Sequence, residues 1–394
     1  MSKIFDKLYI ASTGSEGNSL SIYTSTASSN LISINSATSS YDVLKIRSYA
    51  DSLTYTRDIV TTYAGTGNIT FNGEGVYRTN FNLNNPICIT FDNSGNMHIS
   101  HNFRISKIDK NTGLVTTIAG TSTQGTFSNC LASEATFNAP RSVVFDNNNN
   151  FFVLDINDSG LTPGGRWWRI LKYTATASYI SQIAFSQSAQ QSGYTMAIDT
   201  NTNDLYLAFY AGTKILKLTA PTYSQVTTIT TDYAFLYGID FVTSSNTIYY
   251  STTANLVKKV IGGVTTTIVG NGSTMSIDGV AATASGTYLP SGVKFYNNNL
   301  YIVDRGNNRI RKVDSDGIIT TIAGYTFSNG FYGEGISPLY AKFNTPYDIA
   351  FYDNEIYIAD TANHRIRKVT INTNPYTRTS DATASNLYYQ HMHG

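Results

Sequence analysis

The chain has 394 residues, of which 27 are basic and 26 acidic, and its formal net charge is +1. This balance excludes bulk electrostatic binding to nucleic acid or to an anionic membrane, and no apolar run approaches the length of a membrane-spanning helix. Charged residues make up only 13% of the chain and aromatic residues another 13%. The composition therefore predicts a folded protein with a large core and a polar but sparsely charged surface.

Residues 1–56 are predicted to form an arm that docks on a partner or on another copy of the chain. They are rich in Ser and Thr, and the apolar stretch at residues 8–11 is too short for a signal peptide. The low charge and the many Ser, Thr, Asn and Tyr residues are typical of virion-surface and extracellular proteins, with genome composition as the alternative explanation. We therefore expect a virion or extracellular location, with the cytoplasm as the alternative.

Residues 57–370 contain a repeat of about 54 residues. Runs of the Thr-Thr-Ile type end most units, as at residues 116–118, 266–268 and 320–322. Each unit also contains an anchor residue that is followed five places later by an aromatic or apolar residue. The anchors are residues 86, 140, 193, 236, 290 and 346. Short alternating runs rich in β-branched and aromatic residues lie between these positions, and no segment has helical periodicity. Four short strands per unit at this period predict propeller blades.

The first and last units indicate how the ring closes. One strand of the Thr-Thr type, at residues 58–64, precedes the first unit, whereas the sixth unit ends near residue 369 without such a strand. Combining them would remove two free sheet edges. The sequence thus predicts an all-β, six-bladed β-propeller of four-stranded antiparallel blades, with the last blade closed by an N-terminal strand. Residues 371–394 are predicted to form a C-terminal tail.

Two units carry the pattern of a known family. Pro290 is followed by Leu-Tyr-Ile-Val-Asp at residues 300–304 and Asn-Asn-Arg-Ile-Arg-Lys-Val at 307–313, and residues 346–369 repeat this arrangement. These segments resemble NHL repeats. The first two units match in part, whereas the third and fourth have Phe209 and Thr252 near the position of the strand Asp. The resemblance implies a propeller but not an activity, because the family includes lyases, RNA-binding proteins and interaction platforms.

The resemblance also implies which residues surround the axis. The strand after each recurring position would be innermost, with its second residue near the axis. These residues are small with one exception, and they are Cys88, Ser142, Thr195, Gly238, Gly292 and Asp348. Only one is charged, so we expect a narrow channel without catalytic residues and without a cofactor.

The candidate binding residues lie near one end of the blades. Trp167 and Trp168 are the chain's only tryptophans and follow a Pro-Gly-Gly insertion, where an exposed Trp would contact a partner. Carboxylates that could bind a ligand end three strands, at Asp155, Asp304 and Asp360. The alternative is that these carboxylates accept hydrogen bonds from backbone N–H groups of the following turn. An ion pair with Arg309 or Arg365 would also fit.

Metal binding rests on three histidines. Some propeller lyases that resemble this family hold zinc near the channel, and His98, His101 and His364 lie in the first and last blades, which closure makes neighbours. His98 and His101 are three residues apart in one strand and point to opposite faces, so the three side chains are not expected to converge on a metal.

The leading functional hypothesis is a non-catalytic propeller that presents loops to a protein or glycan partner in a virion or extracellular assembly. The first alternative is a metal-dependent lyase or hydrolase with its site at the hub. The second is a propeller that binds single-stranded RNA through the Arg residues of the third strands. The net charge makes nucleic acid the weaker alternative.

Overall fold

The computed structural model describes residues 54–55, 58–157, 167–174, 176, 178–187, 192–211, 213–232, 234–325, 329–370 and 376–377. The chain divides into two units, Asp58–Ile371 and the combination of Met1–Arg57 with Asn372–Gly394. In the second unit, β1 (Thr54–Tyr55) pairs antiparallel with β29 (Tyr376–Thr377). The predicted assembly role of the arm falls almost wholly outside the described residues and stays a prediction.

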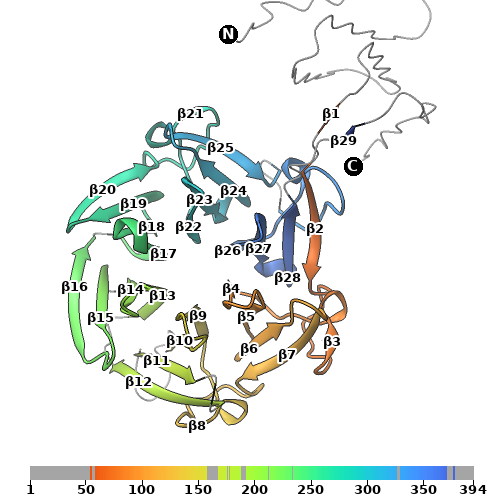
Figure 1. Cartoon of the computed structure of the whole chain (residues 1–394). Coiled ribbons are helices and arrows are strands. Elements are labelled where there is room, and N and C mark those ends of the chain that lie inside the picture. The colour runs from red at the N-terminus through yellow and green to blue at the C-terminus, as the bar shows by residue number, and fades with distance from the viewer. Residues whose placement is uncertain are drawn as a thin grey trace, which may run out of the picture. The chain divides into compact units, whose positions relative to one another are not determined.

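Residues 58–371 form a ring of six antiparallel sheets around a central axis (Figure 1). The first two blades each contain four strands and a short fifth strand at the outer edge. Blade 1 consists of β4 (Cys88–Phe91), β5 (Met97–His101), β6 (Arg104–Ile108), β7 (Leu114–Ala119) and outermost β3 (Val76–Tyr77). Blade 2 consists of β9 (Pro140–Phe145), β10 (Phe151–Asn157), β11 (Trp167–Thr174), β12 (Tyr179–Gln187) and outermost β8 (Cys130–Leu131).

The next two blades are four-stranded, and the fifth again has an additional outer strand. Blade 3 consists of β13 (Ser192–Ile198), β14 (Leu205–Ala211), β15 (Lys214–Thr219) and β16 (Gln225–Thr231). Blade 4 consists of β17 (Leu236–Val242), β18 (Thr247–Thr252), β19 (Leu256–Ile261) and β20 (Val264–Val269). Blade 5 consists of β22 (Val293–Tyr296), β23 (Asn299–Asp304), β24 (Arg309–Val313), β25 (Ile318–Ala323) and outermost β21 (Val280–Ala281).

Blade 6 closes the ring as the strand count predicted. It consists of β26 (Pro346–Tyr352), β27 (Glu355–Asp360), β28 (Arg365–Thr370) and β2 (Ile59–Ala64), which comes from the other end of the chain. The pairing of β2 with β28 begins at Ile59 and Thr370. The six-bladed, all-β architecture is therefore confirmed.

Apolar side chains fill the spaces between neighbouring blades. Both faces of the middle strands are covered, so β23 and β27 have five consecutive buried residues rather than the alternation of a one-sided sheet. Between blades 6 and 1, for example, Phe81 and Ile99 pack with Ala359 and Ile366. This packing holds the inner strands at fixed positions around the axis.

The outer strands of four blades are covered by the connection that enters each blade, which the sequence analysis did not predict. We call these covering stretches capping segments: residues 74–77, 129–131, 278–281 and 334–336. In blade 1, the Glu74 carboxylate accepts hydrogen bonds from the Thr117 backbone N–H and hydroxyl, both at 2.6 Å. In blade 6, Glu334 accepts the same pair of bonds from Thr62. In blades 1 and 6, the second Thr of the Thr-Thr pair thus binds the capping segment.

Glycine follows the acid in these segments because the backbone turns there. Gly75 and Gly335 have φ of 70° and 67°, a conformation that strains residues with a Cβ atom. The connections that enter blades 3 and 4 are only residues 188–191 and 232–235, and the described part of neither contains a capping segment. The short connection into blade 4 accounts for the spacing of 43 residues between positions 193 and 236.

Candidate functional site: the hub cavity

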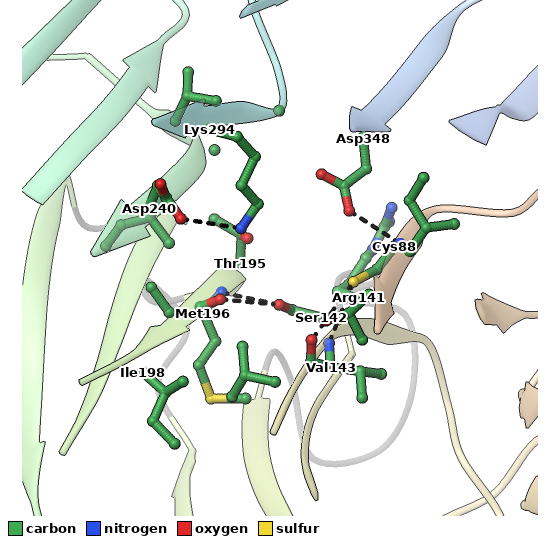
Figure 2. Close-up of a pocket in the computed structure, with 18 of the residues that line it drawn as sticks. Cys88, Arg141, Ser142, Val143, Thr195, Met196, Ile198, Asp240, Lys294 and Asp348 are labelled. Carbon is green, nitrogen blue, oxygen red and sulfur yellow. Dashed lines mark hydrogen bonds and ion pairs between the residues drawn. The ribbon is translucent and has the colours of Figure 1, made fainter. Parts of the chain in front are cut away.

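The six innermost strands, β4, β9, β13, β17, β22 and β26, enclose a cavity of about 270 Å³ on the axis (Figure 2). We call it the hub cavity. All six residues that the sequence placed near the axis line it, and they are Cys88, Ser142, Thr195, Gly238, Gly292 and Asp348. This part of the sequence analysis is confirmed.

Crowding explains why these positions carry small residues. A Cβ atom added to Gly238 would lie 2.0 Å from the Ser291 carbonyl oxygen on the neighbouring blade. Ser251 Oγ fills the remaining space there, because it accepts a hydrogen bond from Gly238 N–H and donates one to Ser291 O. The inner strands therefore approach one another too closely for larger side chains.

Asp348 is the one charged residue among the six axial positions, but other charged side chains also reach the hub. Lys294 and Asp240 also line the hub cavity, and Lys294 Nζ lies 3.1 Å from Asp240 Oδ1. Each stands two residues beyond a predicted axial position, so the alternation of a strand puts both on the same face as Gly292 and Gly238. That periodicity is the signal that could have revealed them.

Asp348 and Cys88 lie across the cavity from this ion pair (Figure 2). The Asp348 carboxylate accepts hydrogen bonds from the backbone N–H groups of Ile89, at 3.0 Å, and Ile349, at 2.9 Å. Cys88 Sγ accepts a hydrogen bond from the Val143 N–H at 3.4 Å. Titratable groups from blades 1, 4, 5 and 6 therefore converge on the axis.

Burial and neighbouring charges shift the pKa values of three of these groups. Burial raises the pKa of the Cys88 thiol well above its ordinary value, so the thiolate nucleophile is suppressed. Burial alone would lower the pKa of Lys294, but Asp240 and Asp348 outweigh it and raise this pKa, which keeps the ammonium charged. Burial also raises the pKa of Asp348, although Lys294 opposes that shift.

Tyrosines close one mouth of the hub cavity. The hydroxyls of Tyr347 on β26 and Tyr194 on β13 are hydrogen-bonded to each other, and these strands belong to opposite blades of the ring. Tyr237 packs edge-on against Tyr194, with ring centroids 5.1 Å apart. Arg141 lies 5.1 Å from the centre of the Tyr194 ring, and Arg305 lies 4.5 Å from that of Tyr237. We call Tyr194, Tyr237 and Tyr347 the tyrosine lid.

The far ends of the inner strands line a second recess of about 500 Å³, which shares Asp240 and Lys294 with the hub cavity. The Lys294–Asp240 pair therefore lies between the hub cavity and this recess. The walls of the hub cavity combine carboxylate and hydroxyl acceptors with ammonium and hydroxyl donors. A ligand that fits this lining carries both hydrogen-bond donors and hydrogen-bond acceptors.

The three predicted strand carboxylates are structural. Asp155, Asp304 and Asp360 are fully buried and lie in three different blades. Asp155 accepts hydrogen bonds from the backbone N–H groups of Asn138 and Ala139 and is paired with Arg169 at 2.8 Å. The expected local turn bonding was wrong for the backbone donors, because the N–H groups bound by the three carboxylates lie 16 or 17 residues earlier, in the connection that enters each blade.

The expected ion pairs of Arg309 and Arg365 were wrong. Asp304 is paired with Arg311 at 3.5 Å, and Asp360 with Arg367 at 3.8 Å. These arginines stand two residues further along the same strands, so they share the face of the predicted ones. Arg365 instead lies 3.8 Å from the centre of the Phe331 ring.

The cationic face proposed for RNA is largely buried. Arg104, Arg169 and Arg309 are 8%, 1% and 5% exposed. Arg104 lies 3.8 Å from the centre of the Phe71 ring. Guanidinium groups held in this way do not present a set of phosphate contacts.

The two tryptophans point to opposite faces of β11. Trp168 is buried against Phe209, with ring centroids 5.7 Å apart. Trp167 is half-buried, 6.3 Å from the Phe185 ring, which is itself 51% exposed. Trp167 thus stays available for a contact, whereas Trp168 belongs to the core.

The three candidate metal ligands have separate partners. His98 Nε2 lies 3.1 Å from Asp92 Oδ2, and His101 Nε2 lies 2.8 Å from Ser106 Oγ. His364 Nδ1 accepts a hydrogen bond from the Asn85 backbone N–H. Among the described residues, no group of three or more His, Cys, Asp or Glu side chains could hold a metal ion.

His101 gives stability a specific pH dependence. Burial lowers its pKa to about 3, against 6.5 in the unfolded chain. Below pH 6.5 the unfolded state takes up a proton that the folded state refuses, so stability is lost as the pH falls from 6.5 toward 3. Going from pH 6.5 to 4.5 is expected to cost about 2 kcal/mol through this residue. Urea unfolding at both pH values should show that the His101→Gln variant loses about 2 kcal/mol less unfolding free energy than the wild type. Equal losses in the two proteins would contradict this role of His101.

No protein-family model matches the chain, and no curated protein matches it in sequence. Solved structures are similar to it in fold. A protein of unknown function from Bacteroides thetaiotaomicron VPI-5482 is 19% identical, with a TM-score of 0.64 over 80% of this chain and 76% of that chain. An auxiliary nutrient binding protein from Bacteroides ovatus ATCC 8483 is 18% identical, with a TM-score of 0.62 over 80% and 77%. A streptogramin B lyase is 12% identical, with a TM-score of 0.50 over 80% and 98%.

These similarities define the fold as a β-propeller. At such low identity they do not define its ligand. No helix in the described part of the chain is long and apolar enough to cross a membrane.

Proposed function

We propose that this protein is a non-catalytic propeller that binds a glycan at the hub cavity and belongs to a virion or another extracellular assembly. The single observation that carries the proposal is the mixed lining of that cavity. Asp240 and Asp348 supply acceptors, Lys294 supplies a charged donor, and Thr195 supplies a hydroxyl, whereas the Ser142 hydroxyl is bonded to the Met196 backbone. Sugar hydroxyls pair with groups of both kinds, and charge-assisted bonds of this sort are the stronger ones.

The protein's other features agree with this assignment. Charged residues make up 13% of the sequence and 29 residues are Tyr, a composition that suits a surface in contact with glycans or with other subunits. The half-buried Trp167 offers a further contact for a protein partner. We propose that the blades are NHL-like repeats on the residues at 300–313 and 356–369.

The alternative of a metal-dependent lyase has weaker support, because His98, His101 and His364 point to different partners. A metal-independent hydrolase would have to use Asp348 as a proton donor, a role toward which burial shifts its pKa and against which Lys294 acts. The lack of an activated nucleophile favours binding over this chemistry.

The test is binding of the full chain to immobilised oligosaccharides, followed by titration of the best one in solution. Replacing Lys294 with Met is expected to weaken binding by about tenfold or more, because a charge-assisted donor is lost. The matched control is Lys312→Met on β24 of the same blade, outside the cavity, which should bind as the wild type does.

Equal binding by Lys294→Met and the wild type would place the glycan elsewhere. Cleavage of the bound oligosaccharide that disappears in Asp348→Asn would contradict the non-catalytic assignment. Thermal unfolding of each variant separates loss of the site from loss of the fold.

A further inference from the structure

The outer edge of blade 3 is uncovered in the described part of the chain. In each of the four covered blades, one apolar residue of β2, β7, β12 or β25 pairs with the capping segment. These residues are Val60, Val115, Ile180 and Ile319. All four are 0% exposed, whereas Val226 at the matching position of β16 is 52% exposed. Blade 3 thus has the apolar residue that a capping segment covers in four other blades, but in the described part of the chain nothing covers it.

β16 also has the Thr residue that contacts the capping segment in blades 1 and 6. In blades 1 and 6, the residue two places after the covered valine is Thr117 or Thr62, which donates its backbone N–H and hydroxyl to a Glu of the capping segment. On β16 the corresponding residue is Thr228, which is exposed. In blade 1 the Val115 carbonyl also accepts the N–H of Gly75 at 2.8 Å, and Val226 occupies the equivalent position on β16.

The edge of β16 lacks the features that normally prevent unwanted pairing. Its sequence is Gln-Val-Thr-Thr-Ile-Thr-Thr, with neither a charge nor a Pro. Exposed edge strands of soluble proteins usually carry such residues, because a bare β-branched edge is a template for another strand. A strand of this kind is expected to have a partner.

The connection into blade 3 is too short to provide that partner. The chain between β7 and β9 runs from Ala119 to Pro140 and includes a capping segment, whereas β12 and β13 are joined by residues 188–191 alone. A β16 strand from a second copy would not supply the acid and glycine met by the matching Thr of blades 1, 5 and 6; blade 2, whose capping segment has neither, carries Gln182 in place of this Thr. The occupant must therefore bring both.

We propose that β16 binds an extended segment of a partner protein, in which an acidic residue and a Gly precede a β-branched residue. The segment adds an antiparallel strand to blade 3, its carboxylate accepts both hydrogen bonds of Thr228, and its β-branched residue covers Val226. Recognition by strand addition of this kind takes affinity from backbone hydrogen bonds and specificity from side-chain positions. This surface is separate from the hub cavity.

The probe is a synthetic peptide with residues 330–338 of this chain, which contain Gly-Glu-Gly-Ile. The full chain is titrated with it up to about 1 mM, while amide hydrogen exchange is followed by mass spectrometry. Saturable binding with new protection of residues 225–231 is expected. A peptide with Glu334→Lys, and the protein variant Val226→Glu, should each weaken binding by about tenfold or more.

Val264→Glu is the matched control, because Val264 on β20 is 68% exposed but lies outside the matching position. It should bind the peptide as the wild type does. No saturable binding, or protection only of β7, β12, β25 or β2, would overturn the proposal. A dimer of the protein alone that Val226→Glu dissociates would overturn it as well, because the occupant would then be a second copy.

Discussion

Deletion of residues 1–66 is expected to lower the thermal midpoint by about 10 °C or more, whereas deletion of residues 376–394 should leave the propeller far closer to the full chain. The first deletion removes β2, on which Val60 and Ala64 are fully buried, and exposes the edge of β28 along its length. The second removes none of the propeller's strands. Differential scanning calorimetry of the three proteins measures both effects.

Added salt or a change of pH should not restore the first truncated protein, because the loss is a missing strand rather than a charge effect. Adding a peptide with residues 58–66 in excess should restore part of the stability by filling the gap beside β28. Equal midpoints for both truncated proteins would contradict closure of the ring by β2.

Replacing Asp155 with Ala is expected to destabilise the protein by about 3–5 kcal/mol, because Arg169 would be left as an unpaired buried charge. The Asp155 carboxylate also accepts the N–H groups of Asn138 and Ala139, which would lose their partner. Both side chains of the ion pair are at most 2% exposed. Urea unfolding at neutral pH measures the change in free energy.

Asp316→Ala serves as the control, since Asp316 is exposed in the turn before β25. Its effect should stay within about 0.5 kcal/mol. If Asp155→Ala lowers the unfolding free energy by no more than this control, the buried ion pair does not hold blade 2 to the connection that enters it. Binding at the hub cavity should be retained in any Asp155→Ala protein that remains folded, because this residue does not line it.

The arrangement of the blades follows from the sequence because it depends on repetition. A period of about 54 residues, alternation within strands and one unpaired terminal strand together define six blades and their closure. The small residues at the axis are also predictable, as Gly238 shows, because six strands meeting at one axis leave no room for a Cβ atom there.

The capping segments were missed because they are too short to show a period. A strand of two residues such as β3 has no alternation to detect, and a Glu-Gly pair such as Glu74-Gly75 is by itself typical of an ordinary turn. Its partner, Thr117, lies 43 positions away in the chain. Contacts of this kind become predictable only when the same acid and Thr are compared between units.

The partner of a strand carboxylate in its ion pair depends on the side-chain conformation of the arginines, not only on their positions in the strand. Asp304 faces Arg309 across the sheet in register, yet Arg311 forms the bond. Sequence spacing defines the shared face but not which of two arginines on it turns toward the carboxylate. The hub pair of Lys294 and Asp240 is predictable from strand alternation, because each residue stands two positions beyond an axial residue, Gly292 or Gly238, on the same face.

The pairing of Ile59 with Thr370 has a mechanical consequence. The chain enters and leaves the ring at adjacent points of one sheet, so whatever is joined to either end is tethered to blade 6. Tension applied between the two ends loads the β2–β28 ladder one hydrogen-bonded pair at a time, as a zipper is opened, instead of shearing it along its whole length. Tension between one end and a contact elsewhere on the ring passes through blade 6 first.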